Sequence, residues 1–430
     1  MSRNRLTLFR LVSVIVVLAG MCPLHAYAQF VYVNDNNFNS GANTATGYKV
    51  VPGPALSIIA GSPYATFGTG LGKFFAPLQE VAIAYGTNFK NCLFVSDPLV
   101  TSSFPNGDIA AYKINAGTGV LTYVGNFVDP TDTSGANNLG IPLAIDRRVG
   151  FPYLFAGFTG ESKIAYFKVN PGNCKLTWVS STPAVGISGS APPQGMAVTK
   201  TGPHVVVVSY GDGSVQTFKI VGASLVPKPL VTSTGFINQS AIPEGVDITA
   251  NGKYAVFGDN QPLGTEVEVA KILPSGALST TVDYGGPANA SGVNLGPGVN
   301  SQNVWISPGF ISGKNYLYIS NDYSSQVTTA RLSGLGIVSA IPSTGCTGVF
   351  TNPTTLNPGT WSFPAGLHTV KTTPSGTGLV VGEFGGPSSV ALLRIQNTSG
   401  CTKEVTGSPF ADPNSNFGVF SLDVFPSRPF

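Results

Sequence analysis

The chain has 430 residues, of which 10% are charged and 42% hydrophobic, with 53 glycines and 33 prolines. This composition disfavours long helices, because Gly and Pro are poor helix formers, and it disfavours disorder, because the apolar residues suffice for a core. The formal net charge of +3 comes from three arginines within residues 1–28, so the rest of the chain is neutral. A neutral chain argues against a large basic surface for nucleic acid or an anionic membrane.

The first 28 residues have the pattern of a secretory signal peptide. A basic start precedes an apolar run over residues 11–20, and the small-residue site Ala26-Tyr27-Ala28 follows it. Cleavage after Ala28 would leave residues 29–430 as a single domain that is secreted or periplasmic. A lipid anchor on Cys22 is the alternative, but Met21 precedes this cysteine where a lipoprotein signal would have a small residue. The apolar run over residues 11–20 is short for a membrane span, and no other window has about 18 uncharged apolar residues, so no membrane span is expected.

A short apolar strand recurs seven times after the signal peptide. The central residues of successive copies lie 62, 61, 52, 49, 62 and 62 positions apart. These central residues are Tyr32, Phe94, Phe155, Val207, Val256, Tyr318 and Val380. After the first copy, a strand ending in a Gly turn precedes the repeated strand, as in residues 196–202. Two more strands follow it, the third as in residues 214–220 of the same copy and the fourth as in residues 175–179 of the copy before. Four antiparallel strands repeated seven times predict an all-β, seven-bladed β-propeller.

The two ends of the repeat are complementary. The copy that begins at Phe30 lacks a preceding strand, and the last strand, over residues 419–425, has no copy after it. The C-terminal strand is therefore predicted to complete the first blade as its innermost strand. This pairing would remove two exposed sheet edges.

The strands of Tyr or Phe followed by apolar residues, with a Gly-turn strand before each, resemble those of a known family. The phrases Gly61-Ser-Pro-Tyr-Ala65 and Gly407-Ser-Pro-Phe-Ala411 strengthen the match, which covers residues 30–430. The chain resembles the lactonase-type, YVTN-repeat propellers, which include 6-phosphogluconolactonase and the muconate cycloisomerases. The resemblance implies hydrolysis or isomerisation of a small lactone or sugar-derived substrate in the central funnel.

The family's enzymes are expected to place His, Arg and Glu in that funnel, and here the chain departs from the pattern. His204, Arg147 and Arg148 fall at the end of the blades opposite the presumed mouth. No catalytic residue is therefore carried over from the resemblance, and the funnel is expected to be poorly supplied for phosphate recognition.

The residues that begin the innermost strands supply the site candidates. Aligned positions at the mouth place Gln79, Gln194 and Gln302 as substrate-binding amides, because amides suit hydroxyl and ring-oxygen ligands. Glu244 is the only ionisable residue of this set and is the candidate catalytic acid or base, with His368 as its partner. The alternatives are that the amides bind water and cap strands, and that the histidine packs in the core.

Neither metals nor organic cofactors are indicated. No phosphate-binding loop, dinucleotide fingerprint, nucleophile elbow or HExxH motif occurs. Four acids at equivalent places after second strands are candidate Ca²⁺ ligands, but they lie on different blades, and Asp at such a place also makes turns: Asp35, Asp97, Asp259 and Asp322. An exported chain is expected to form disulfides, and three pairings are open to its four remaining cysteines, Cys92, Cys174, Cys346 and Cys401.

Two function classes follow. One is a lactonase-like hydrolase acting in the funnel, and the other is a non-catalytic extracellular propeller that binds a glycan or a protein. An acid and a base that face the funnel together would favour the first class, and an amide-lined, water-filled mouth would favour the second. The substrate and the oligomeric state are left open by the sequence.

Overall fold

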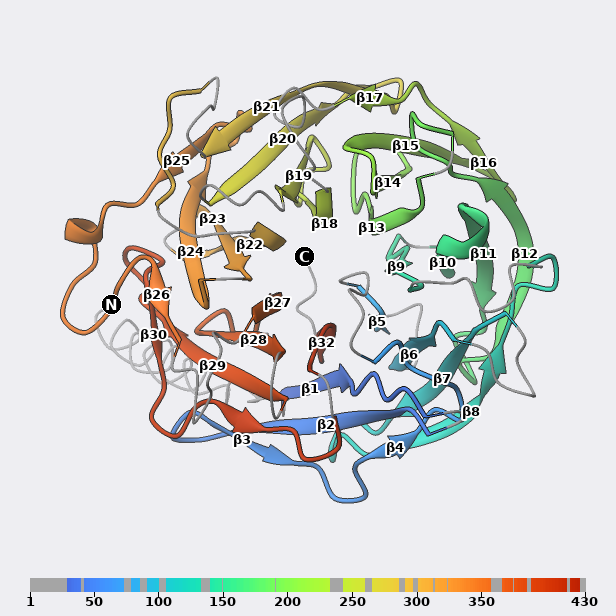
Figure 1. The fold of residues 1–430 in the computed structure, drawn as a ribbon, viewed down its shortest axis with the longest axis horizontal. Helices are drawn as coiled ribbons and strands as arrows, with labels where there is room; N and C mark the ends of the chain where they lie inside the picture. Colours follow the sequence, from blue (N-terminus) through green and yellow to red (C-terminus); the bar gives the residue numbers. More distant parts are fainter. Residues whose placement is uncertain are drawn as a thin grey trace, which may run out of the picture.

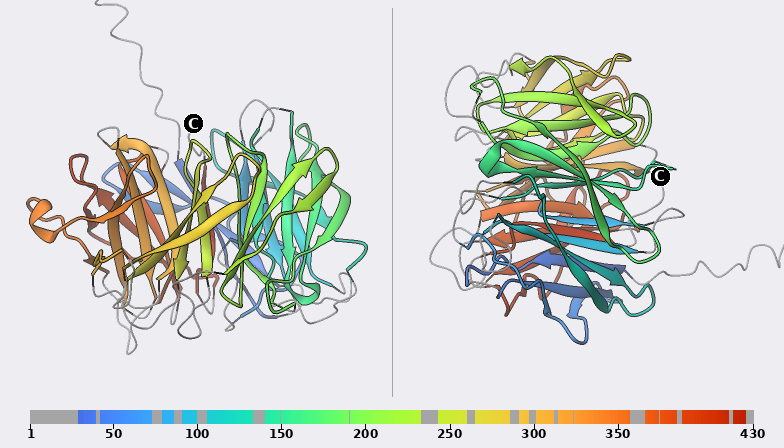
Figure 2. Two further views of the ribbon diagram at one scale, coloured as in Figure 1. Left: turned by 90° about the horizontal axis from the view of Figure 1, so that it is seen from above. Right: turned by 90° about the vertical axis from the view of Figure 1, so that its right-hand side faces the viewer.

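The computed structural model shows seven antiparallel β-sheets arranged as a ring around a central channel (Figure 1). Each sheet is one blade, and the blades follow one another around the ring in chain order. Seen from the side, the ring is a disc whose strands run across its thickness (Figure 2). The seven-bladed all-β prediction is confirmed.

The structure describes residues 29–39, 42–72, 79–85, 91–99, 106–132, 140–148, 150–189, 191–232, 243–259, 265–285, 291–296, 301–311, 314–322, 324–356, 366–373, 375–384, 388–415 and 418–425. The predicted signal peptide, residues 1–28, lies outside them. Within the described residues no helix has the length and apolar character needed to cross a membrane. Two 3-10 turns occur there, η2 (Thr159–Glu161) and η4 (Ser343–Gly345).

Each blade is described from its innermost strand outward. Blade 1 has β32 (Leu422–Phe425), β1 (Gln29–Asn34), β2 (Thr44–Val51) and β3 (Ala55–Ile58); blade 2 has β5 (Val81–Ala84), β6 (Cys92–Asp97), β7 (Asp108–Ile114) and β8 (Leu121–Phe127). Blade 3 has β9 (Leu143–Ile145), β10 (Tyr153–Phe158), β11 (Lys163–Val169) and β12 (Leu176–Pro183); blade 4 has β13 (Pro193–Val198), β14 (Val205–Tyr210), β15 (Ser214–Val221) and β16 (Ser224–Pro227).

Blade 5 has β18 (Pro243–Ile248), β19 (Tyr254–Asp259), β20 (Glu266–Ile272) and β21 (Leu278–Gly285); blade 6 has β22 (Ser301–Ile311), β23 (Lys314–Asn321), β24 (Gln326–Leu332) and β25 (Val338–Ala340). Blade 7 has β27 (Gly366–Thr372), β28 (Gly378–Phe384), β29 (Ser389–Ile395) and β30 (Thr402–Glu404). A short extra strand pairs with the third strand of blades 1, 4, 6 and 7: β4 (Tyr64–Ala65), β17 (Val231–Thr232), β26 (Thr354–Thr355) and β31 (Phe410–Ala411).

The core lies between neighbouring blades. The seven central residues predicted from the repeat lie on the second strands, and all of them are completely buried. Hydrophobic clusters combine side chains of adjacent blades, as Phe94 of blade 2 and Phe158 of blade 3 do in one of them. The hydrophobic face of each sheet is thus covered by the next sheet, which is why a single blade could not be stable alone.

Glycines in the hairpins between third and fourth strands allow the blades to approach closely. Gly400 of blade 7 has φ +78°, and a Cβ built there would lie 2.4 Å from the Tyr316 ring of blade 6. Gly336 is placed in the same way, with its Cβ position 2.4 Å from the Tyr254 ring of blade 5. These positions need glycine both for the positive φ and for the contact with the aromatic ring.

The C-terminal strand closes the ring as predicted. β32 pairs with β1 so that Phe425 stands opposite Phe30 and Asp423 opposite Tyr32. The paired strand is shorter than the predicted residues 419–425, because the Val419 amide instead donates to the Glu383 carbonyl of blade 7 at 3.0 Å.

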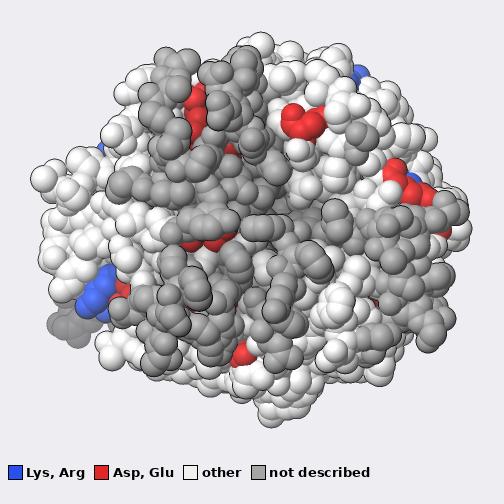
Figure 3. All heavy atoms as spheres, viewed as in Figure 1, with Lys and Arg blue, Asp and Glu red and all other residues white. Residues whose placement is uncertain are grey.

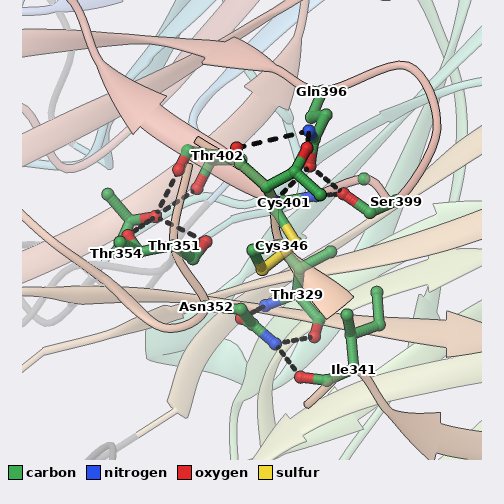
Figure 4. The surroundings of a disulfide bond; sticks show 12 residues. Thr329, Ile341, Cys346, Thr351, Asn352, Thr354, Gln396, Ser399, Cys401 and Thr402 are labelled. Atoms are coloured by element: carbon green, nitrogen blue, oxygen red, sulfur yellow. Dashed lines mark hydrogen bonds between the residues drawn. A yellow bond between two sulfur atoms is a disulfide. The ribbon is translucent and has the colours of Figure 1, made fainter. Parts of the chain in front are cut away.

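Two disulfides join neighbouring blades and settle the cysteine pairing. Cys92 pairs with Cys174 across blades 2 and 3, and Cys346 of blade 6 pairs with Cys401 of blade 7. Figure 4 shows the second bond within a polar network. Beside it, the Thr354 and Thr402 hydroxyl oxygens lie 2.6 Å apart, which ties the same two blades together.

Candidate functional site in the central channel

Each innermost strand starts at one end of the channel, which we call the mouth end, and turns into the second strand at the opposite, turn end. One position on each innermost strand is paired with the buried central residue of the second strand. In blades 1 to 7 this position holds Asp423, Ala82, Ala144, Ala197, Asp247, Trp305 and Lys371. The first six line a cavity of about 70 Å³ inside the channel.

The two sides of this cavity differ in side-chain size. Blades 2, 3 and 4 contribute alanines, whereas blades 5, 6, 7 and 1 contribute large polar or charged residues. Arg147 and Lys200, each two residues beyond an innermost strand, also line the cavity, on the side where the alanines leave room. We call Arg147, Lys200, Asp247, Trp305, Lys371 and Asp423 the channel cluster.

The two carboxylates of the channel cluster join adjacent innermost strands. Asp247 accepts hydrogen bonds from the backbone N–H of Ile248 (2.8 Å) and from that of Ile306 in the next blade (2.9 Å). Asp423 accepts an equivalent pair, from the residue that follows it (2.9 Å) and from Ile83 in the next blade (2.9 Å). Both carboxylates are therefore fixed by backbone donors, and their negative charge is held at the channel.

Two of the three cations are held between a carboxylate and an aromatic ring. Arg147 Nη2 lies 3.9 Å from Asp423 Oδ2, and its guanidinium lies 4.9 Å from the centre of the Tyr85 ring. Lys371 Nζ lies 4.0 Å from Asp423 Oδ1 and 4.0 Å from the centre of the Trp305 ring. The Arg147 and Lys371 side chains stay 20% and 15% exposed, so solvent reaches both.

Lys200 is the third cation, and its protonation is finely balanced. Burial, together with the nearby charges of Arg147 and Lys371, lowers the pKa of its amine to about 7, while Asp247 and Asp423 oppose the shift. Burial also lowers the pKa of Lys371. Near neutral pH a large fraction of Lys200 is therefore the neutral amine, which can act as a base or a nucleophile.

Gln79 crosses the channel at the mouth side of the cavity. Its Oε1 accepts a hydrogen bond from the backbone N–H of Met196 in blade 4 (2.6 Å), and its Nε2 donates to the Val246 carbonyl in blade 5 (3.0 Å). Gln79 itself precedes the innermost strand of blade 2, so its side chain must span the channel to reach both partners. Since Met196 also lines the cavity, this amide bounds the cavity on that side.

The other predicted site residues lie elsewhere or are only partly described. Gln194 is a half-buried bulge residue of β13 whose Nε2 lies beside Gly211 of its own blade. Glu244 and Gln302 lie on β18 and β22, but their side chains fall outside the described residues. Their convergence with Gln79 stays a prediction.

His368 is on β27 and is completely buried, edge-on to the Phe420 ring at 4.7 Å. Burial lowers its pKa to about 3, so the imidazole is neutral at pH 7. It is not among the residues that line the channel cavity. This placement suits the packing alternative, and its pairing with Glu244 stays a prediction.

The basic residues at the turn end separate into two groups. Arg148 donates to the carbonyls of Thr199 (2.9 Å) and Pro203 (3.0 Å), and His204 Nε2 lies 2.5 Å from Asp146 Oδ2. These residues stabilise the turns between blades 3 and 4. Arg147 lies at the same end but is turned into the channel. The expectation that the funnel is poorly supplied with cations for phosphate recognition is therefore wrong.

Buried carboxyl pairs occur nearer the mouth end. Asp97 and Asp108 stand directly opposite each other on β6 and β7, and both carboxyl groups are buried. Asp97 Oδ1 also accepts hydrogen bonds from Asn43 (2.6 Å) and Thr66 (3.0 Å). Burial raises the pKa of Asp97 to about 7, and burial together with the charge of Asp97 raises the pKa of Asp108 well above its usual value.

Asp35, Asp97, Asp259 and Asp322, the acids considered for a metal, are buried on separate blades. Among the described residues no group of three or more His, Cys, Asp or Glu is arranged to hold a metal ion. On the face shown in Figure 3, the charged side chains of the described residues form isolated spots.

A second hollow, of about 430 Å³, lies outside the channel between blades 1 and 7. Arg394 is the one charged residue among those that line it within the described structure, and it is exposed. Hydroxyl groups on its wall bond to one another, as Ser375 and Thr377 do at 2.8 Å. The channel cavity combines bases, carboxylates and an aromatic ring, so it is the better candidate for chemistry.

No protein-family model matches the chain, and no curated protein sequence does so. Solved structures match its fold over most of its length. A protein from Lactobacillus plantarum is 13% identical with a TM-score of 0.65, the match covering 92% of this chain and 99% of the other. A candidate 6-phosphogluconolactonase from Bacteroides uniformis is 11% identical with a TM-score of 0.61 over the same shares of the two chains, 92% and 99%.

A periplasmic gluconolactonase from Pseudomonas aeruginosa is 14% identical with a TM-score of 0.56, and the match covers 92% of this chain and 99% of that one. At these identities the comparison concerns the fold and not the chemistry. Membership of the YVTN-repeat family stays a prediction. The chain is a seven-bladed propeller with the fold of gluconolactonase and 6-phosphogluconolactonase-like propellers.

Proposed function

We propose that the protein is a lactonase-like hydrolase that opens a small lactone in the channel cavity. The observation that carries the proposal is the channel cluster, in which a partly deprotonated amine, Arg147 and two fixed carboxylates line one cavity. Lys371 lies beside it, 4.0 Å from Asp423 Oδ1. The lactonase-type structures with this fold support the same chemistry. The cavity volume of about 70 Å³ suits the lactone ring itself, since one water needs about 10–15 Å³ on this measure.

The residues can share the work of ester hydrolysis. The neutral amine of Lys200 takes a proton from a water molecule as that water attacks the ring carbonyl carbon. Arg147 and Lys371 stabilise the negative charge that develops on the carbonyl oxygen. When the ring C–O bond breaks, the Lys200 ammonium returns its proton to the leaving alkoxide, and the products are the hydroxy acid and the unchanged enzyme. Asp247 and Asp423 keep the three cations in the channel.

The test is an activity screen of purified residues 29–430 against five- and six-membered lactones, with K200M and the exposed-residue control K113M. Removal of the base should lower kcat by about 10²–10⁴-fold, and K113M should match the wild type. The rate of the wild type should rise with pH through about 7, as Lys200 loses its proton and its pKa is about 7. Equal activity of K200M and K113M would contradict the assignment.

The predicted mouth residues are tested in the same screen. If Glu244 is the acid or base, E244Q should lose about 10²–10⁴-fold in kcat while K200M stays active. If the channel cluster carries the reaction, K200M should lose activity and E244Q should stay active.

A non-catalytic binding propeller is the second candidate, and one observation favours it. Both channel carboxylates accept hydrogen bonds from backbone N–H groups of two blades, so each already has a structural role that needs no chemistry. Such a protein would be stabilised thermally by a lactone, hydroxy acid or glycan without any turnover.

Export is also proposed, on the signal-peptide pattern of residues 1–28. The mature chain should begin at Gln29, which mass spectrometry of the exported protein can check. A lipid on Cys22 or an uncleaved N-terminus would contradict it.

A further inference from the structure

The channel cavity brings an amine together with groups that recognise an anion. Lys200 lines the cavity beside Arg147, and Asp247 and Trp305 line it from blades 5 and 6. Lys371 lies next to that wall, 4.0 Å from the Trp305 ring centre. With Lys200 as the neutral amine, Arg147 and Lys371 are the two cations that remain in the channel cluster to recognise an anion.

Arg147 and Lys371 are available to a ligand because the two carboxylates beside them have other partners. Asp247 and Asp423 each accept two backbone hydrogen bonds. Arg147 Nη2 donates to the Ile83 carbonyl at 3.1 Å, whereas its distance to Asp423 Oδ2 is 3.9 Å, too long for a hydrogen bond. A small carboxylate could therefore pair with Arg147 and Lys371 without displacing a close ion pair.

We propose that Lys200 forms a reversible imine with a small aldehyde or keto acid, whose carboxylate is bound by Arg147 and Lys371. This reactivity uses the same cavity as the proposed function but does not depend on lactone hydrolysis. A cavity of about 70 Å³ has room for about five to seven water-sized positions, which matches an acid of the size of glyoxylate or pyruvate.

The step is balanced without a further reactant. The neutral Lys200 amine adds to the carbonyl carbon to form a carbinolamine, and loss of one water molecule gives the imine. Burial and the nearby cations lower the pKa of Lys200 and so favour the neutral amine at pH 7, which is what this addition requires. Asp247 and Asp423 raise the pKa of the same amine, so the reactivity depends on all four charged neighbours.

The experiment traps the imine on the intact mature chain. Glyoxylate with cyanoborohydride at pH 7 converts an imine into a stable carboxymethyl-lysine, and peptide mass spectrometry identifies the lysine. Lys113, exposed on β7, is the internal control in every sample. An ordinary lysine is about 1 part in 10³ neutral amine at pH 7, so Lys200 should be labelled at least about ten-fold faster than Lys113 even with restricted access.

Two variants separate recognition from reactivity. K200R should abolish the fast labelling and leave the Lys113 rate unchanged. K371M should slow labelling of Lys200 by glyoxylate more than labelling by acetaldehyde, because only glyoxylate has a carboxylate. Labelling of Lys200 no faster than that of Lys113 would overturn the proposal, even if lactones are hydrolysed. Fast labelling with no lactone turnover would support it and count against the proposed hydrolase.

Discussion

Replacement of Asp97 by asparagine should flatten the pH dependence of stability. In the folded protein burial raises the pKa of Asp97 from 3.8 to about 7. Its folded pKa is therefore above its unfolded value, so the stabilisation is fully present below about pH 4 and is lost as the pH rises to about 7. A rise of this size corresponds to about 4 kcal/mol, of which about 3 kcal/mol is lost between pH 5 and pH 8.

The amide introduced by D97N would keep the acceptor oxygen for Asn43 and Thr66 and would turn an N–H group toward Asp108, which stands opposite it. Urea unfolding at pH 5 and pH 8, at constant ionic strength, measures the difference for the wild type and for D97N.

The control variant is D212N. Hydrogen bonds from Ser214 and Ser188 outweigh burial and lower the pKa of Asp212, so its contribution is present above about pH 4 and is lost only as the pH falls below that. D212N should therefore keep the wild-type change between pH 5 and pH 8. The same change in D97N as in the wild type would refute the raised pKa of Asp97.

Two further substitutions test the packing between blades and the channel. G400A places a Cβ 2.4 Å from the Tyr316 ring, so it should cost at least about 2 kcal/mol in the free energy of unfolding. The control G407A, also at positive φ but with nothing within 4 Å, should cost about 1 kcal/mol. Equal losses in the two variants would contradict the contact between residue 400 and the Tyr316 ring. Q79A removes the hydrogen bond to the buried Met196 amide, so it should lower the free energy of unfolding by about 1–3 kcal/mol with the fold retained. An unfolding midpoint equal to that of the wild type would show that this bond does not stabilise the fold.

The repeat makes the fold predictable from the sequence, because each blade needs the same buried central residue. Tyr32 and Tyr318 are buried for that reason, and the pairing of β32 with β1 follows from the missing strand of the first copy. The disulfide pairing cannot be chosen from the repeat, because it depends on which hairpins of neighbouring blades come close in space.

An alignment of the residues that begin the innermost strands, at the mouth, does not identify the channel cluster. The residue opposite each central residue gives Asp247, Trp305, Lys371 and Asp423 from the same repeat. Arg147 cannot be found in this way, because it lies beyond its strand and reaches the cavity through the length of its side chain. Only the structure shows that it turns inward while Arg148 does not.

The pairing of β32 with β1 has a consequence for how the chain reaches its native state. Phe30 and Phe425 stand opposite each other although nearly the whole chain separates them, so this contact is among the least local that the fold contains. Such contacts form late, because a long loop must close before they stabilise anything. Until the last strand is available, blade 1 keeps an unpaired edge next to the channel, and the ring stays open. A chain released in stages, from a ribosome or across a membrane, would thus complete its propeller only after β32 has emerged.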